Sequence, residues 1–125
     1  MVSELARVEA EQRGNLCIIR LHGEVDISND KEVLSAIEMA VPHSAVRLIV
    51  DLTNTTYLDS AGLALFIRLA ERLQARRQQM LIVSPRGSPV RTVLEITGLP
   101  SVVPLEARLE DAVRESEQGT RDGGT

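Results

Sequence analysis

The strongest constraint on the fold is an apolar run at residues 46–52, in which Arg47 and Asp51 are the only charged residues. A strand with almost no polar interruption is typical of the interior of a sheet, where both of its faces are buried. A second run of this kind occupies residues 80–84. Because segments with helical periodicity alternate with these strands, the sequence predicts an α/β fold with a mostly parallel sheet and right-handed crossovers.

The remaining segments predict a single domain with the element order β-β-α-β-α-β-α-β-α. The expected helices cover residues 29–41, 61–77, 89–97 and 105–116. The expected strands cover residues 5–12, 16–22, 46–52, 80–84 and 102–103, and the first two flank a turn signal and form a hairpin. Residues 53–59 are predicted to form a loop. The domain spans residues 1–116, and the polar, glycine-rich residues 117–125 are predicted to be a disordered tail.

Composition bounds the classes of function. The chain has 125 residues, a net charge of −4 and only Tyr57 and Phe66 as aromatic residues, so an aliphatic core is expected. A chain of this charge lacks the basic excess of a direct nucleic-acid binder. No run approaches the length of a membrane span and the N-terminal segment has no apolar signal core, so the cytoplasm is the expected compartment. The single cysteine, Cys17, lies in an apolar run and is expected to be a buried, inert thiol.

Asp59 and Ser60 stand where a predicted buried strand is joined to the longest predicted helix. In open α/β sheets, functional groups gather where strands end and helices begin. Either residue could cap the helix by accepting hydrogen bonds from its first free N–H groups, and the residue types alone favour this interpretation. Alternatively, Ser60 is a regulatory phosphorylation site, because a helix N-terminus favours an anion and the small residues Ala61 and Gly62 leave the hydroxyl accessible.

Four stretches of the chain carry a resemblance to a known family. They are LHGEVD at residues 21–26, LIVDL at 48–52, YLDSAGL at 57–63 and VRTVLEITGL at 90–99. In this order and spacing, they resemble the STAS domain of the bacterial anti-sigma factor antagonist family, and the Asp-Ser-small-Gly-Leu element is the most specific of them. The family often has Ser where this chain has Ala61 and a further Gly where it has Ala64, but both positions keep a small residue.

The resemblance implies a partner-switching role without catalysis, metal or cofactor. In the family, the anti-sigma factor is a serine kinase of the GHKL type that phosphorylates the serine corresponding to Ser60. The unphosphorylated antagonist binds this kinase and frees a sigma factor, and a serine phosphatase resets the switch. Asp26, Asp59, Ser60, Ala61 and Gly62 are then expected to form the partner-binding face of a monomer or weak homodimer.

Other uses of the same domain stay open. STAS domains also serve as scaffold subunits of stress-sensing complexes and as accessory subunits of lipid or anion transporters. Thr53, Thr55 and Thr56 precede the Asp59-Ser60 element and could be additional phosphorylation sites, as in some stress-complex relatives. Polar loop residues are the simpler interpretation of the three threonines.

Two unrelated classes of protein fit the sequence less well. Asp51 ends a buried strand as the phosphoacceptor of a receiver domain would, but the acidic pair and the lysine of that chemistry are missing, so a hydrogen bond within the loop is expected. In a hydrolase, His22 would have to act as the base for Ser60. A histidine at a strand end is more simply solvated, and no phosphate-binding glycine loop is present.

The helix predicted at residues 61–77 has three faces of interest. Its core stripe is expected to be Leu63, Phe66, Ile67, Ala70 and Leu73. A row formed by Arg68, Arg72 and Arg76 is expected to be a solvated face. Leu65 and Leu69 lie between the stripe and the row, where an apolar patch facing a partner is conceivable.

Overall fold

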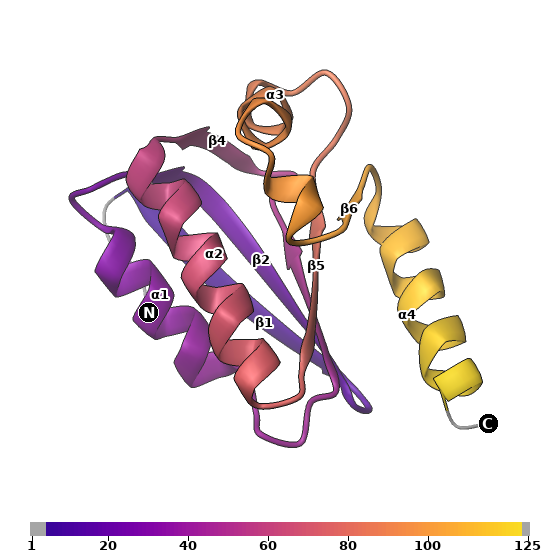
Figure 1. Cartoon of the computed structure of the whole chain (residues 1–125). Coiled ribbons are helices and arrows are strands. Elements are labelled where there is room, and N and C mark those ends of the chain that lie inside the picture. The colour runs from indigo at the N-terminus through magenta and orange to yellow at the C-terminus, as the bar shows by residue number, and fades with distance from the viewer. Residues whose placement is uncertain (1–4, 124–125) are drawn as a thin grey trace.

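The computed structural model describes residues 5–123 of the chain. In chain order its elements are β1 (Ala6–Arg13), β2 (Leu16–Val25), α1 (Asp30–Ala40), β3 (Arg47–Asp51), β4 (Thr55–Leu58), α2 (Ser60–Ala75), β5 (Gln79–Val83), α3 (Pro89–Ile96), the short 3-10 helix η1 (Leu99–Ser101), β6 (Leu105–Glu106) and α4 (Leu109–Gly123). Within these residues, one mixed sheet is combined with helices as the sequence predicts for an α/β fold (Figure 1).

The sheet has the strand order β1-β2-β3-β5-β6, and β4 also pairs with β2. β1 runs antiparallel to β2, whereas the other pairings are parallel, so the predicted hairpin and mostly parallel sheet are confirmed. β2 pairs with β3 through residues 16–20 and then with β4 through residues 23–25. The C-terminal ends of β2 and β4 therefore lie side by side at one end of the sheet (Figure 1).

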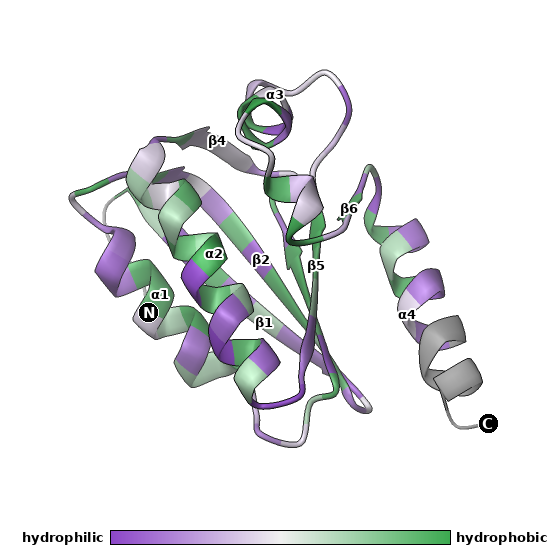
Figure 2. Cartoon of the chain, viewed as in Figure 1, coloured by the Kyte–Doolittle hydropathy of each residue, from purple (hydrophilic) through white to green (hydrophobic). Residues whose placement is uncertain are grey.

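Helices cover both faces of the sheet. The larger core lies between the sheet and α1 and α2, and a smaller core lies beneath Ala112 of α4. In β3, Leu48 and Val50 belong to the larger core and Ile49 to the smaller one, which explains why the interior of the strand is apolar on both faces. Cys17 is buried, as predicted. Figure 2 shows hydrophobic residues concentrated on the central strands, while the helices mix hydrophobic and hydrophilic positions.

The segment predicted as a loop at residues 53–59 contains the strand β4. Threonine and tyrosine have high strand propensity, and three of them begin this strand. Thr55 is buried, and its hydroxyl donates a 2.7 Å hydrogen bond to the carbonyl of Leu21. This internal partner allows a polar side chain to occupy a buried strand position, which the polar composition of the segment concealed.

The C-terminal part differs from the prediction in its last strand and in its last helix. The short strand lies at Leu105–Glu106 and not at residues 102–103, because the N–H groups of Val102 and Val103 donate to the Leu99 carbonyl and continue the turn of η1. The last helix begins at Leu109 and continues to Gly123, where a disordered tail was expected from residue 117. Ala112 anchors the first half of this helix in the smaller core, and adding residues to an existing helix costs much less than starting one. Residues 124 and 125 of the predicted tail lie outside the described residues.

The buried face of α2 is rotated relative to the prediction. Leu65 and Leu69 are each only 1% exposed, whereas Ile67 is 40% exposed. The apolar run at residues 63–67 fits two neighbouring faces of a helix, and docking against the sheet selects the one centred on Leu65, Phe66 and Leu69. Leu65 and Leu69 therefore belong to the core, and the suggested partner-facing patch at these residues is wrong.

Candidate functional site

The first turn of α2 is capped by Asp59. Its backbone is extended, and its Oδ1 atom accepts hydrogen bonds of 2.9 Å from the Ala61 N–H and 3.1 Å from the Gly62 N–H. A carboxylate at this position satisfies two of the free N–H groups and also interacts favourably with the helix dipole. Of the two capping candidates in the sequence, Asp59 is the one that performs this role.

Asp59 also connects the two loops that meet at this end of the sheet. Its Oδ2 atom accepts a 3.1 Å hydrogen bond from the Ile27 N–H, and its own N–H donates to the Val25 carbonyl at 3.3 Å. The parallel pairing of β2 with β4 brings these segments together, although they are distant in sequence. The loop after β2 and the start of α2 thus form a single surface.

Ser60 is the first residue of α2, and its side chain is exposed. Among the side chains of residues 5–117 and the backbone of residues 5–123, its hydroxyl has no hydrogen-bond partner, and Asp59 already accepts from the first N–H groups of the helix. The Ser60 hydroxyl is therefore not needed to complete the fold. It is exposed at the surface, which the capping interpretation of this residue would not have predicted.

Asp26 shapes the neighbouring loop. Its Oδ1 atom accepts hydrogen bonds from both the N–H and the hydroxyl of Ser28, and these bonds lower the pKa of the Asp26 carboxyl from its ordinary value. Asn29 closes the loop from the other side, because its Oδ1 atom accepts from the Asp26 N–H and its Nδ2 atom donates to the Glu24 carbonyl. Asn29 occupies the N-cap position of α1 but uses its side chain to hold the loop, not to cap the helix.

Ile27 is a residue of this surface that the sequence reasoning missed. Its side chain is 81% exposed between Asp26 and Ser28. It borders a groove of about 400 Å³ between the starts of α1 and α2, together with Ala61 and residues of both charge signs. The groove is lined by Ile27, Ser28, Asp30, Lys31, Glu32, Ala61 and Arg68. An isoleucine inside a polar loop is the sequence signal that could have indicated an apolar contact for a partner.

Gly62 lies beneath the surface. A β-carbon at this position would lie 3.0 Å from Leu58 Cδ2 and 3.1 Å from the Val25 carbonyl oxygen. The glycine therefore lets α2 approach β2 and β4 closely, while Ala61 and Ser60 reach the outside. The structure brings all five residues predicted for the partner-binding face to the same end of the sheet. Gly62, however, is buried there and packs against Leu58 and Val25.

The other residues considered as functional candidates from the sequence make hydrogen bonds or an ion pair within the fold. Asp51 accepts hydrogen bonds from the N–H and hydroxyl of Thr53, so the expected bond within the loop is confirmed. His22 contacts the Glu9 carboxylate on β1 through Nε2. Thr55 is buried, and its hydroxyl is hydrogen-bonded. Thr53 and Thr56 are both exposed, and their hydroxyls donate to Asp51 Oδ1 and to the Gly23 carbonyl, the latter at 3.2 Å.

Neither a metal-binding cluster nor a membrane-spanning helix occurs in the described part of the chain. Among the side chains of residues 5–117, there is no group of three or more His, Cys, Asp or Glu that could hold a metal ion. Over the same residues, each helix is too short or too polar to cross a membrane. All three residues of the predicted arginine row are exposed, as expected for a solvated helix face, and Arg72 also pairs with Glu38 of α1.

The sheet with its antiparallel first strand, and the capped α2 beside the loop after β2, define an α/β domain of the STAS type. The STAS domain family model matches residues 7–112, and the chain belongs to this family.

Named relatives of the chain include regulators of sigma factors. It is 29% identical over 84 residues to an anti-sigma-B factor antagonist of Listeria monocytogenes, covering 67% of this chain and 73% of the relative. The fold is shared with an anti-sigma factor antagonist from Mycobacterium paratuberculosis, with a TM-score of 0.78, 24% identity and coverage of 88% of this chain and 92% of the other. It is also shared with the Bacillus cell fate determinant SpoIIAA in its phosphorylated form, with a TM-score of 0.64, 23% identity and coverage of 88% and 99%.

Proposed function

We propose that this protein is an anti-sigma factor antagonist whose partner-binding face is centred on Ser60 and is switched off by phosphorylation of that residue. The observation that carries the proposal is the exposed, unbonded Ser60 hydroxyl at the start of a helix that Asp59 already caps. The names of the relatives support the regulatory role. That one of them, SpoIIAA, has been described in a phosphorylated form supports a switch of this kind.

The effect of a phosphoryl group follows from the local charges. It would add roughly −1.5 to −2 charge units at neutral pH. The Asp59 carboxylate already occupies the N–H groups of Ala61 and Gly62, so the phosphate would project outward beside it. The surface around Ile27 now presents an apolar side chain among groups of both charge signs, and a phosphoryl group on Ser60 would concentrate negative charge there. The change would repel a partner shaped for the unmodified surface while leaving the core untouched.

The proposed partners are an anti-sigma factor that is a GHKL-type serine kinase, and a serine phosphatase. In the forward step, Ser60 Oγ attacks the γ-phosphorus of ATP held by the kinase, ADP leaves, and the hydroxyl proton passes to a base of the kinase. In the reverse step, the phosphatase transfers the phosphoryl group to water and restores the serine. The protein itself supplies only the acceptor, and it acts in the cytoplasm without contacting nucleic acid.

The proposal is tested by incubating the purified protein with candidate kinases of this type and ATP, and locating phosphate by mass spectrometry. We expect a single phosphate on Ser60, lost in Ser60→Ala and retained in Ser44→Ala, which removes another exposed serine. Phosphate on a threonine alone, or none with the kinase that binds the protein, would defeat it. A chain that binds no kinase but copurifies with a stress complex or a transporter would favour those alternative uses of the domain.

A further inference from the structure

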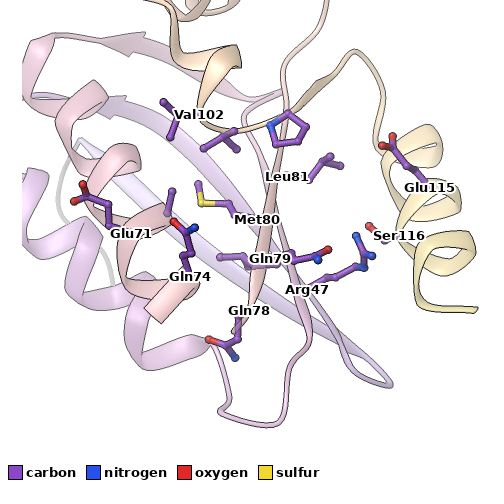
Figure 3. Close-up of a pocket in the computed structure, with 14 residues that line it drawn as sticks. Arg47, Glu71, Gln74, Gln78, Gln79, Met80, Leu81, Val102, Glu115 and Ser116 are labelled. Atoms are coloured by element: carbon purple, nitrogen blue, oxygen red, sulfur yellow. The ribbon is translucent and has the colours of Figure 1, made fainter. Parts of the chain in front are cut away.

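A second surface lies beside the other half of α2, away from Ser60. A groove of about 340 Å³ follows the outer edge of β5 (Figure 3). One wall comes from Ala70, Glu71 and Gln74 of α2, and the opposite wall from the last helix, α4. The rise of about 1.5 Å per helical residue places Ala70 about 15 Å from Ser60 along the helix. This groove is therefore separate from the partner-binding face described above.

The groove exists because β6 is much shorter than its neighbour. β6 pairs only with Ile82 and Val83, at the C-terminal end of β5. The Ile82 N–H donates to the Pro104 carbonyl at 3.0 Å, and the Ser84 N–H donates to the Glu106 carbonyl at 2.8 Å. Backbone N–H groups alternate sides along a strand, so the Met80 N–H points to the same side. Among residues 5–123, no strand lies opposite it.

The open part of this edge has the length and the shape of a short strand. Residues 79–81 span about 10 Å at the usual rise per strand residue. Met80 packs against the larger core on the α2 side, and Leu81 belongs to the smaller core on the α4 side. Figure 3 shows the lining side chains on both sides of β5, with Glu71 and Gln74 on one side and Glu115 and Ser116 on the other. An added strand, whose side chains alternate between two faces, would reach both sides.

The side chains that line the groove indicate the chemistry of the occupant. Its centre is apolar, formed by Met80, Val102, Val103 and other aliphatic residues. The charged residues of the lining are Glu71 and Glu115, on the two walls, and Arg47. Carboxylates therefore outnumber cations in the lining, which favours a segment with net positive charge and an apolar residue turned toward Met80.

We propose that the open edge of β5 binds an extended, positively charged segment of a protein partner by strand addition. The segment would continue the sheet where β6 stops, exchanging main-chain hydrogen bonds with the Met80 backbone and placing an apolar side chain against Val103. Main-chain bonds supply affinity in this mode of recognition, and the alternating side-chain contacts supply specificity. The surface would serve for docking, independently of whether Ser60 is modified.

The test uses the full chain and a phage-displayed library of short random peptides. Enriched peptides are synthesised, and their dissociation constants are measured by fluorescence anisotropy. We expect net-positive peptides, and about a tenfold loss of affinity for Met80→Pro, which removes the edge donor but keeps the pairing with β3. Proline is tolerated on a strand edge whose N–H faces outward, and Met80→Leu is the matched control that keeps the donor. Circular dichroism establishes that both variants are folded.

A second variant keeps the proposal testable if Met80→Pro does not fold. Glu71→Lys reverses an exposed charge of the groove and should weaken the same peptides several-fold, whereas Glu110→Lys makes the same change of net charge on α4 outside the lining. Amide chemical shifts should change at residues 79–81. The absence of enriched peptides, shifts confined to the Ser60 surface, or unchanged affinity in Glu71→Lys would overturn the proposal. Self-association that Met80→Pro abolishes would instead assign the edge to a second copy of the chain.

Discussion

At the N-terminal end of α2, the backbone N–H groups of Ala61 and Gly62 are hydrogen-bonded, and the Ser60 hydroxyl is exposed. Beside the C-terminal half of α2, the side chains are packed, and part of the β5 backbone has no partner strand among the described residues. Asp59 accepts from the first N–H groups of the helix, so the Ser60 hydroxyl has no structural task. Near Ala70, β5 has a backbone edge that β6 is too short to cover. The first arrangement suits reversible chemical modification and the second suits main-chain recognition.

The comparison also separates the residues that build a surface from those that act on it. Asp59 and Ser60 are adjacent in sequence, but only Asp59 is tied to two other segments, through Ile27 and the α2 backbone. If this division of roles is correct, substitutions at the two positions should affect different quantities. Stability should depend on Asp59 and partner binding on Ser60.

The largest effect is expected for Asp59→Ala. The substitution removes the cap of α2 and the bond that holds the Ile27 backbone, so we expect the free energy of unfolding to fall by about 2 kcal/mol. The measurement is urea denaturation followed by circular dichroism. Ser60→Ala is the matched control and should stay within about 0.5 kcal/mol of the parent protein. Equal losses for the two variants would mean that Ser60 has a structural role that the hydrogen bonds do not reveal.

A smaller effect, on binding alone, is expected for Ser60→Asp. A carboxylate next to Asp59 partly reproduces the charge of a phosphate, so we expect affinity for the anti-sigma kinase to fall about tenfold, or 1.4 kcal/mol. The melting temperature should barely change, because acidic residues are favourable in the first turn of a helix. Isothermal titration calorimetry measures the affinity, with Ser60→Asn as the uncharged control. Retained affinity in Ser60→Asp would show that charge at this position is not what the partner detects.

These predictions rest on features that were accessible from the sequence to different degrees. The apolar strand β3 and the Asp59-Ser60 element are local patterns, and the sequence placed both correctly. The division of roles between the two residues could not be predicted, because it depends on a hydrogen bond between Asp59 and Ile27, which are 32 positions apart. The rotation of α2 was missed because its apolar run fits two faces, and contact with the sheet decides between them.

Two features of the sheet were hidden for other reasons. β4 looked like a loop because the burial of Thr55 depends on a bond to the Leu21 carbonyl. The open edge of β5 follows from the length of β6, which has only two residues in the ladder. Strands this short carry almost no periodic signal, so neither the strand nor the groove it leaves could be located from residue types.

The smallest expected effect concerns the acidic residues that flank the β5 edge. A hydrogen bond with Glu115 raises the pKa of the Glu106 carboxyl, with burial and the charges of Glu115 and Asp111 acting in the same direction. The folded protein thus holds this proton more tightly than the unfolded chain does. The resulting stabilisation is present at acidic pH and is lost as the pH rises from the ordinary glutamate range through the raised pKa.

Glu106→Gln should remove this dependence, because a neutral amide can still donate to the Glu115 carboxylate. Water screens both groups, so we expect a gain of only about 0.5 kcal/mol in the free energy of unfolding at pH 7, and none at pH 4. Urea denaturation at the two pH values measures the difference, with Glu110→Gln on the exposed side of α4 as the control. The gain should shrink in high salt, since repulsion between exposed charges is screened. A loss of stability at pH 7 would mean that the Glu106 charge has a favourable partner, and it would weaken the assignment of a negatively charged rim to this edge.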